Sequence, residues 1–470
     1  MKKNRTKIAL CVLALVMVLA TLSMTSCSSY YSELLEYYRE LGEANANNNN
    51  NYGDGTQIPP SDKNNTSPDT DKGGVDTESG EADVNIKVEM DDSFSGDGVV
   101  TPVISGGDNV KATAQGLRSV VSVYCSFEVT SGGTSFWNPN PTTQTYYSTG
   151  SGVIYKTEAD GSGFIITNFH VVYEGDSNTK NNISDKIFVY LYGMANEKYA
   201  IPATYVGGSA NYDIAVLRVD KSEVLKKAVE RGSVTGIKVA DSDLLLPGQT
   251  TIAIGNPATD GIGGISVTQG IVSVESEYIS MSALDGSAAT VDFRVIRTDA
   301  PVNAGNSGGG LFNDRGELIG IVNAKIMSSD VENIGYAIPS NVARAVADNI
   351  IDNCYNTDCE SVMRGMLGIT ITTNGLSTVY DEESGLIIRA EQIMVYEVTA
   401  GGLASPILKA GDVVKSITVG DRTVSVTRQY HLIDAMLDVR VGDNVSITVV
   451  RDGVETTVST QITKDCLMAY

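Results

Sequence analysis

Three separated segments of the chain carry residue types that can cooperate in nucleophilic catalysis. They contain His170, Asp213 and Ser307, each at the edge of a run of apolar residues. A serine hydroxyl is a weak nucleophile until a base takes its proton, and histidine suits that task because its ordinary pKa is ~6.5. A buried carboxylate can orient the imidazole and stabilise the imidazolium that forms. The three residues therefore predict a catalytic triad.

The surroundings of Ser307 add a second element of the same chemistry. Ser307 lies in the glycine-rich stretch 305–310, and glycine permits backbone conformations that other residues resist. The backbone N–H groups of Gly305 and Ser307 are predicted to converge on a developing oxyanion. Taken singly, a histidine after a strand, an aspartate before one and a serine in a turn are ordinary structural features. The chain order histidine, aspartate, serine is that of the chymotrypsin fold, which favours the joint interpretation.

Charge and composition exclude several other functions. The chain has 470 residues and a formal net charge of −23, which opposes binding to nucleic acid or to an anionic lipid surface. It contains two histidines, His170 and His431, and six cysteines without a CxxC pair. A zinc site is therefore not expected, and the predicted chemistry needs neither a metal nor an organic cofactor.

The first 27 residues have the pattern of an export signal. A basic start is followed by an apolar run over 8–22 and by small residues before Cys27. This run is shorter than the ~20 residues that a spanning helix needs. The ending Met-Thr-Ser-Cys resembles a bacterial lipobox, which implies lipidation of Cys27, with Met24 where leucine is usual. An uncleaved signal anchor is the alternative. Both place the protein outside the cytoplasm, anchored to the bacterial cell membrane.

Residues 28–111 are predicted to be a spacer. Residues 30–41 have helical spacing of apolar side chains, and the stretch that follows is rich in Asn, Gly, Ser, Asp and Pro. Such a composition cannot bury enough apolar surface to offset its ordering entropy. We therefore expect a membrane-proximal helix followed by a disordered acidic linker.

Residues 112–352 are predicted to form a β-rich domain. Short β-branched runs such as 164–167, 214–219 and 318–322 alternate with Gly, Asn and Asp turns. Helices are expected only at 225–229 and at 341–351, where the second would close the domain. Many short strands with few long helices indicate barrels or sandwiches.

Several segments in this domain resemble the HtrA/Deg family of trypsin-like serine proteases. The resemblance covers about 112–465 and rests on the segments around His170 and Asp213, on Gly305-Asn306-Ser307-Gly308-Gly309 and on Gly335-Tyr336-Ala337-Ile338-Pro339. It implies a mostly β fold, a chymotrypsin-like double six-stranded β-barrel followed by a PDZ domain. It also implies a substrate pocket at Val322, Asn323 and Ala324, a preference for small aliphatic side chains, and a homotrimer. Ala304 and Gly310 stand where the family usually has proline, and this loosens the loop that carries Ser307.

Residues 362–465 resemble a PDZ domain, a β-sandwich with flanking helices. Gly365, Met366, Leu367, Gly368 and Ile369 resemble the loop whose N–H groups hold a peptide's terminal carboxylate. The strand after this loop would pair with the peptide, and a helix over 429–439 would flank the groove. The alternative is a β-rich appendage that binds no peptide.

The cysteines outside the signal segment are Cys125, Cys354, Cys359 and Cys466. In an oxidising compartment, Cys354 and Cys359 could close a small loop after the β-rich domain. Free thiols remain the alternative at this point.

These observations predict an extracytoplasmic serine endopeptidase that cleaves unfolded or damaged proteins through an acyl-enzyme, with PDZ capture of peptide C-termini. Two alternatives remain open. One is a regulatory protease for a single membrane substrate, and the other is a chaperone or scaffold on a protease fold.

Overall fold

The computed structural model describes residues 109–131, 141–194, 197–257, 264–282, 290–324, 334–382 and 385–470. The expected signal segment, Cys27 and the linker up to residue 108 therefore lie outside the described residues. All the described residues belong to one compact unit. Within the described ranges, no helix is both long enough and apolar enough to cross a membrane.

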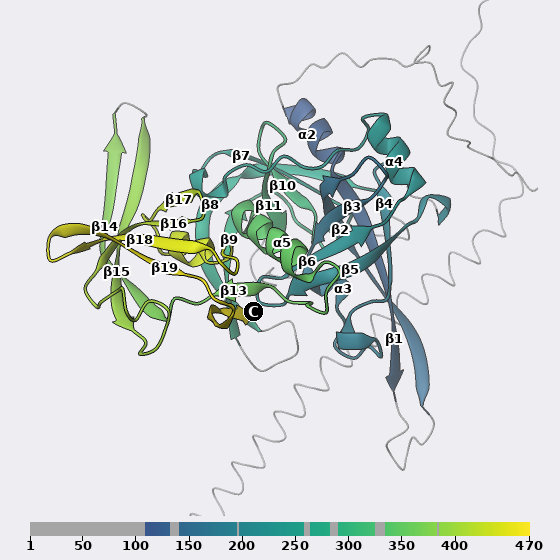
Figure 1. Ribbon diagram of the computed structural model, residues 1–470. Helices are drawn as coiled ribbons and strands as arrows, with labels where there is room; N and C mark the ends of the chain where they lie inside the picture. The colour runs from purple at the N-terminus through teal and green to yellow at the C-terminus, as the bar shows by residue number, and fades with distance from the viewer. Residues whose placement is uncertain are drawn as a thin grey trace, which may run out of the picture. The chain divides into compact units, whose positions relative to one another are not determined.

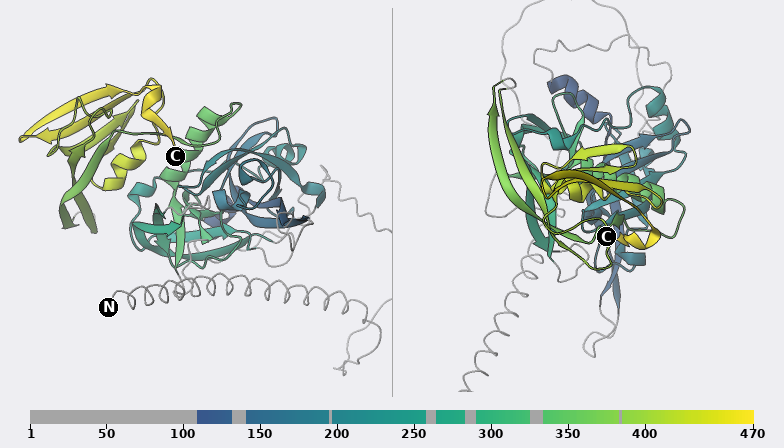
Figure 2. Two further views of the ribbon diagram at one scale, coloured as in Figure 1. Left: turned by 90° about the horizontal axis from the view of Figure 1, so that it is seen from below. Right: turned by 60° about the vertical axis from the view of Figure 1, so that its left-hand side comes forward.

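Two closed six-stranded barrels form the first part of this unit (Figure 1). The strand order around the first barrel is β1-β2-β3-β6-β5-β4, and around the second it is β10-β11-β12-β9-β8-β7, with antiparallel neighbours throughout. Figure 2 shows the two barrels from further directions. The expected double barrel is confirmed.

The strands of the first barrel are β1 (Val120–Ser131), β2 (Thr142–Thr157), β3 (Gly163–Thr167), β4 (Lys186–Leu191), β5 (Ile201–Ser209) and β6 (Ile214–Val219). Those of the second are β7 (Thr250–Gly255), β8 (Ser266–Ser282), β9 (Thr290–Thr298), β10 (Gly310–Phe312), β11 (Leu318–Val322) and β12 (Gly335–Pro339). β3, β6 and β11 are buried along their whole length, in agreement with their mainly apolar sequences; Thr167 at the end of β3 and Arg218 in β6 are the polar exceptions.

The helices around the barrels are α2 (Asn109–Leu117), α3 (Phe169–Val172), α4 (Glu223–Glu230) and α5 (Ser340–Cys354), with short 3₁₀ turns at Lys180–Asn182, Glu197–Tyr199 and Ser242–Leu244. α4 begins with Ser222 as a cap, whose hydroxyl accepts from the N–H of Leu225 at 3.2 Å. α5 buries Val342, Val346 and Ile350 in the core shared by the two barrels. Helix α2, which the sequence reasoning did not predict, places Ala112 in the same core.

A smaller β-rich domain follows α5. Its main sheet has the order β14-β15-β16-β18-β19, with β17 on β16, and β13 pairs with β20 in a separate two-stranded sheet. Its elements are β13 (Met363–Gly365), β14 (Ile369–Asp381), β15 (Leu386–Val398), β16 (Val413–Val419), β17 (Arg422–Ser425), α6 (Gln429–Ala435), β18 (Asn444–Arg451), β19 (Val454–Gln461), a 3₁₀ turn (Lys464–Cys466) and β20 (Leu467–Ala469).

Helix α6 is shorter than the helix expected over 429–439. It ends at Ala435, and the next residues form tight turns in which Leu437 and Asp438 donate to the carbonyl groups of Asp434 and Ala435. These three-residue bonds replace the four-residue bonds of an α-helix.

A disulfide joins Cys354 at the end of α5 to Cys359, which decides between the two alternatives that the sequence left open. Cys125 is a buried free thiol in the first barrel, and Cys466 is a half-buried free thiol in the C-terminal domain. The loop closed by the disulfide leads directly from the barrels to β13.

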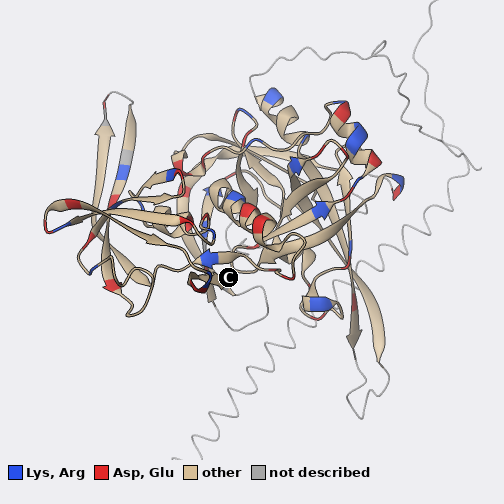
Figure 3. Cartoon of the chain, in the orientation of Figure 1, with Lys and Arg blue, Asp and Glu red and all other residues tan. Residues whose placement is uncertain are grey.

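Charged residues link α5 to the C-terminal domain. Figure 3 shows acidic and basic residues together on α5. Arg344 pairs with Asp438 at 3.1 Å, and Asp352 pairs with Arg440 at 3.0 Å. The buried side chain of Asn349 donates to the carbonyl oxygens of Met363 and Leu437 at 2.8 and 3.0 Å. The two domains therefore share polar contacts along one face of α5.

Candidate active site

Asp213 lies at the start of β6 in a left-handed backbone conformation, with φ of 48°. Aspartate tolerates this conformation better than most residues. The side-chain amide of Asn168 donates to the backbone carbonyl of Asp213 at 2.8 Å and fixes the turn. The carboxylate of Asp213 is fully buried and points toward His170.

His170 lies on the short helix α3, directly after the turn that ends β3. Its backbone N–H donates to Asp213 Oδ1 at 3.0 Å, and its Nδ1 lies 2.7 Å from Asp213 Oδ2. A carboxylate at Nδ1 favours the tautomer with the proton on that nitrogen, which leaves Nε2 able to accept one. The imidazole remains 15 % exposed, so a substrate can reach it.

Ser307 lies in the loop before β10. Its Oγ accepts a hydrogen bond from the backbone N–H of Ala324 at 3.1 Å. No hydrogen bond joins Ser307 Oγ to His170 within the residues that the structure covers. Such bonds are often long in enzymes without substrate and tighten in the complex.

The loop around Ser307 is fixed by the first barrel. Ser151 N–H donates to the carbonyl of Ser307 at 2.8 Å, and Ser151 Oγ donates to the carbonyl of Gly305 at 2.8 Å. Gly308 has φ of 84°, and a Cβ there would overlap the carbonyl oxygen of Ser151 and the hydroxyl of Thr167. The close approach of the two barrels therefore requires glycine at 308.

The predicted oxyanion donors are the N–H groups of Gly305 and Ser307. Gly305 has φ of 91°, and its carbonyl is turned toward Ser151. The neighbouring N–H groups are occupied, since Asn306 donates to Asn303 and Gly308 donates to Val322. Those of Gly305 and Ser307 have no acceptor in the described part of the chain. This arrangement leaves two donors beside Ser307 for a ligand oxygen.

The segment expected to line the substrate pocket has other contacts. The Asn323 side chain is fully buried and donates to Asp213 Oδ2 at 2.7 Å, on the oxygen that also binds His170. The Val322 side chain lies in the core of the second barrel, and its backbone pairs with Gly308 and Gly309. Ala324, half-buried, contacts Ser307 through its N–H. Val322 and Asn323 therefore position the site through buried contacts instead of presenting side chains to a substrate.

The sequence reasoning missed the roles of Asn168, Ser151 and Asn323. All three are polar residues that are fully buried. Each lies in or beside an apolar strand, where an unpaired polar group would be costly. A polar residue within or beside an apolar run was the signal in the sequence that could have identified them.

The carboxylate-binding loop predicted in the C-terminal domain is partly occupied. The N–H of Gly365 donates to Met436 O at 3.2 Å, and that of Met366 donates to Cys466 O at 3.1 Å. Neither can hold a ligand without breaking these bonds. The N–H groups of Leu367 and Gly368 have no acceptor among the described residues. Ile369 begins β14, an edge strand of the main sheet.

The double barrel with a buried aspartate, a histidine and a serine at the contact of its halves defines the class of trypsin-like serine peptidases. Residues 150–321 match the family model described as "Trypsin-like peptidase domain". The chain is 34% identical over 313 residues to "Serine protease Do-like HtrA" of Bacillus subtilis (strain 168), covering 66% of this chain and 62% of the relative.

A second relative is matched over more of its length. "Serine protease Do-like HtrA" of Lactococcus lactis subsp. cremoris (strain MG1363) is 34% identical over 327 residues, covering 67% of this chain and 71% of that protein. The chain belongs to the HtrA family of serine proteases. Among solved structures, "HtrA-type protease AlgW with decapeptide" is 27% identical, with 76% of this chain and 98% of that chain covered and a TM-score of 0.44.

Proposed function

We propose that this protein is an extracytoplasmic serine endopeptidase that cleaves unfolded or damaged polypeptides. The observation that carries the proposal is the 2.7 Å contact between His170 Nδ1 and the buried Asp213 carboxylate, next to a glycine loop that presents Ser307. Membership of the HtrA family supports it.

The proposed reaction proceeds through an acyl-enzyme. Ser307 Oγ attacks the carbonyl carbon of the scissile peptide while His170 Nε2 takes the hydroxyl proton. The N–H groups of Gly305 and Ser307 stabilise the negative oxygen that forms. His170 then gives the proton to the leaving amine. Water, activated by His170, attacks the Ser307 ester and releases the second product. Asp213 orients His170 throughout.

Capture of peptide C-termini by the C-terminal domain is the second part of the proposal. β14 lies at the edge of its sheet, so a peptide strand can be added to it. The N–H groups of Leu367 and Gly368 lie at the beginning of this strand and are the donors we assign to a terminal carboxylate. Gln429 on α6 donates to Thr373 Oγ1 on β14 at 3.2 Å, and an incoming peptide would replace this bond.

The proposed location is the extracytoplasmic side of the cell membrane. The export pattern of residues 1–27 supports it, with lipidation of Cys27 or an uncleaved signal as the anchor. A relative that is 32% identical over 281 residues is named "Periplasmic pH-dependent serine endoprotease DegQ", from Escherichia coli (strain K12). A homotrimer is proposed from the family resemblance.

The test compares the full chain with its Ser307→Ala variant on casein as an unfolded substrate. Ser307→Ala removes the attacking oxygen and the hydrogen bond that it accepts from the Ala324 N–H, so the variant is expected to fold with a small change in thermal stability and to release no fragments. Gel electrophoresis and mass spectrometry of the fragments would measure this and map the cleaved bonds.

Equal fragmentation by both forms would contradict the proposal. If neither form cleaves, an active-site phosphonate probe would distinguish a latent peptidase from a scaffold, since only the former would be labelled at Ser307. Addition of peptides with apolar C-termini would test whether the C-terminal domain controls the latent state.

A further inference from the structure

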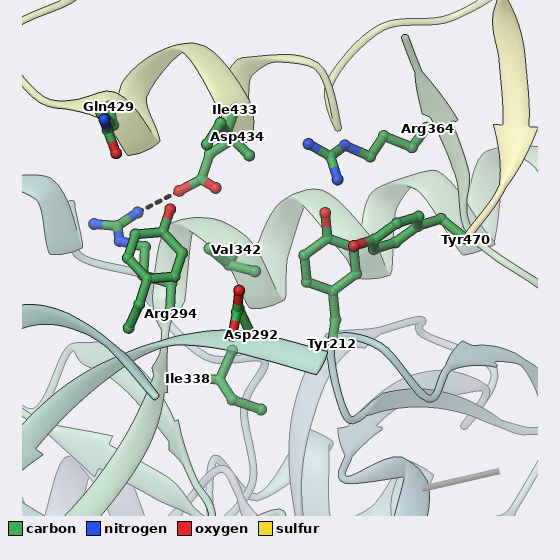
Figure 4. A pocket seen from close by; sticks show the side chains of 11 residues that line it. Tyr212, Asp292, Arg294, Ile338, Val342, Arg364, Gln429, Ile433, Asp434 and Tyr470 are labelled. Atoms are coloured by element: carbon green, nitrogen blue, oxygen red, sulfur yellow. Dashed lines mark hydrogen bonds and ion pairs between the residues drawn. The ribbon is translucent and has the colours of Figure 1, made fainter. Parts of the chain in front are cut away.

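A cavity of about 370 Å³ lies between the second barrel, α5 and the C-terminal domain. Its volume falls in the ordinary range of small-molecule sites, ~300–1,000 Å³. Figure 4 shows that Tyr212 enters it from the segment before β6, Arg364 from β13 and Tyr470 from the end of the described chain. None of these residues takes part in the reaction proposed above.

Two polar groups in this cavity have unused hydrogen-bonding capacity. The Tyr212 hydroxyl and Arg364 Nε are both buried, and neither has a hydrogen-bond partner in the described ranges. A buried polar group without a partner is costly, so each such group needs an explanation. In Figure 4 the Tyr212 hydroxyl points toward the Arg364 guanidinium, and the two line the same cavity.

The other arginine in the cavity is already neutralised. Arg294 pairs with Asp243 at 2.7 Å and with Asp434, and its guanidinium lies over the ring of Tyr430. Arg364 lies over the Tyr470 ring at 4.9 Å but has no ion pair with a carboxylate in the described part of the chain. Arg364 is therefore the positive charge available to an occupant.

The remaining walls restrict the kind of anion. Ile338, Val342 and Ile433 form an apolar side, which favours an aliphatic group. The carboxylates of Asp292 and Asp434 also line the cavity, and they would repel an anion with two charges. An occupant with one negative charge and a short hydrocarbon chain satisfies both conditions.

We propose that this cavity is a binding site for a small aliphatic monocarboxylate. Its two oxygens accept from Arg364 and from the Tyr212 hydroxyl, and its chain packs on Ile338, Val342 and Ile433. Hydrogen bonds between a guanidinium and a carboxylate are among the stronger ones in proteins, which suits a ligand of few atoms. Binding does not require proteolytic activity.

The site is adjacent to the catalytic segment. Tyr212 directly precedes Asp213, and its ring lies 5.3 Å from that of Tyr470. The carbonyl of Tyr470 accepts from Ser209 Oγ at 2.8 Å. An occupant would therefore contact Tyr212, which directly precedes Asp213. It would also contact Tyr470, which is hydrogen-bonded to Ser209 in the same part of the chain.

The experiment measures binding of pentanoate to the full chain in a non-ionic detergent, by titration calorimetry and ligand-observed NMR. We expect saturable binding with a Kd in the millimolar range or below. Tyr212→Phe should weaken it about tenfold or more, since it removes one bond to a charged group. Arg364→Met should abolish it. Arg315→Gln, at an exposed arginine paired with Glu317, is the matched control and should bind as the parent does.

Pentylamine and inorganic phosphate serve as probes of ligand charge and should not bind. The proposal is overturned if pentanoate shows no saturable binding, if Arg364→Met retains the parent's affinity, or if pentylamine binds equally well. If Arg364→Met does not fold, as judged by thermal unfolding, Tyr212→Phe decides, because it keeps the ring on Tyr470. Unchanged affinity in Tyr212→Phe then overturns the proposal. Casein cleavage plays no part in this test, so its outcome is independent of the proposed peptidase function.

Discussion

Asp213 accepts three hydrogen bonds on its carboxylate, two from His170 and one from Asn323. Because the group is fully buried, each donor replaces a water molecule that it would have bound in solution. Two of the three donors fix the histidine to the carboxylate. The third, Asn323, fixes the carboxylate to the second barrel, so that the histidine and serine halves of the site keep their spacing.

Substitution of Asn323 tests this positioning role. Asn323→Ala removes a bond worth about 1.5–3 kcal/mol to a charged group, so we expect kcat on a peptide substrate to fall about 10- to 100-fold. KM should change little, since the buried amide does not contact the substrate. Asn374→Ala, at an exposed asparagine bonded to Gln392, should retain the parent's kcat. An unchanged kcat in Asn323→Ala would remove Asn323 from the catalytic arrangement.

Substitution of Gly308 tests how much the close packing of the two barrels contributes to stability. Gly308→Ala adds a Cβ in a left-handed conformation and in contact with Ser151 and Thr167, so we expect a loss of about 3 kcal/mol or more in the free energy of unfolding. Gly248→Ala is the matched control, because Gly248 also has a positive φ of 91° but has no neighbour within 4 Å of the added atom. It should cost only about 1–2 kcal/mol. Urea unfolding measures both, and equal losses would mean that the close packing at 308 contributes nothing.

At the scale of elements, α5 and the loop after it connect the barrels to the C-terminal domain. The helix buries one face in the shared core and presents Arg344 and Asp352 to the second domain. The disulfide between Cys354 and Cys359 closes the end of this helix with a sequence separation of 5 residues. A short closed loop restricts the unfolded chain only modestly.

Reduction of this disulfide should therefore have a small effect. We expect dithiothreitol to lower the free energy of unfolding by about 2 kcal/mol, which is the loop-entropy value for such a spacing. The double variant Cys354→Ala/Cys359→Ala should show no further change with the reductant, because Cys125 and Cys466 are free thiols. Thermal unfolding with and without the reductant measures this. A reductant effect that persists in the double variant would contradict the assignment.

At the scale of the whole molecule, a buried ionic cluster joins the two domains. Arg294 on β9 serves two carboxylates, Asp243 from the barrel domain and Asp434 on α6. For Asp243, burial opposes ionisation, but the charge and hydrogen bond of Arg294, together with the hydrogen bond from Asn341, outweigh it and lower the pKa. For Asp434, burial outweighs Arg294 and raises the pKa to about 6. One arginine therefore does not fully compensate both buried carboxylates.

This raised pKa predicts a pH dependence of stability. Between about pH 6 and the ordinary carboxyl pKa of ~3.9, the folded protein holds a proton on Asp434 that the unfolded chain does not. The contribution of Asp434 to stability therefore rises as the pH falls through 6 and is constant above it. Relative to Asp434→Asn, the parent should gain roughly 1.4 kcal/mol between pH 7 and pH 5.

Chemical unfolding of both forms at the two pH values measures this difference. The neighbouring His431, whose pKa is lowered by burial, is present in both forms, so its own titration largely cancels. A stability difference that is independent of pH, or that moves in favour of Asp434→Asn on acidification, would contradict the prediction.

The sequence by itself determined the residue types of the triad, their order and the strands that carry them. This was possible because β3, β6 and β11 consist mainly of apolar residues and because the glycines around Ser307 mark a turn with special backbone angles. It left open whether Cys354 and Cys359 are paired or free, and the structure decided for the disulfide.

The tertiary structure decided which polar residues face one another. Asn323, Asn168 and Ser151 are polar residues whose partners are distant in the sequence. The pairing of β3 with β6 brings Asn168 to Asp213, and the packing of the two barrels brings Asn323 to Asp213 and Ser151 to Gly305. The cavity around Tyr212 and Arg364 depends in the same way on the packing of α5 against the second domain. A short segment of sequence determines whether a helix or a strand is favoured there. The contacts between elements depend on residues that are far apart in the sequence, so no short segment can predict them.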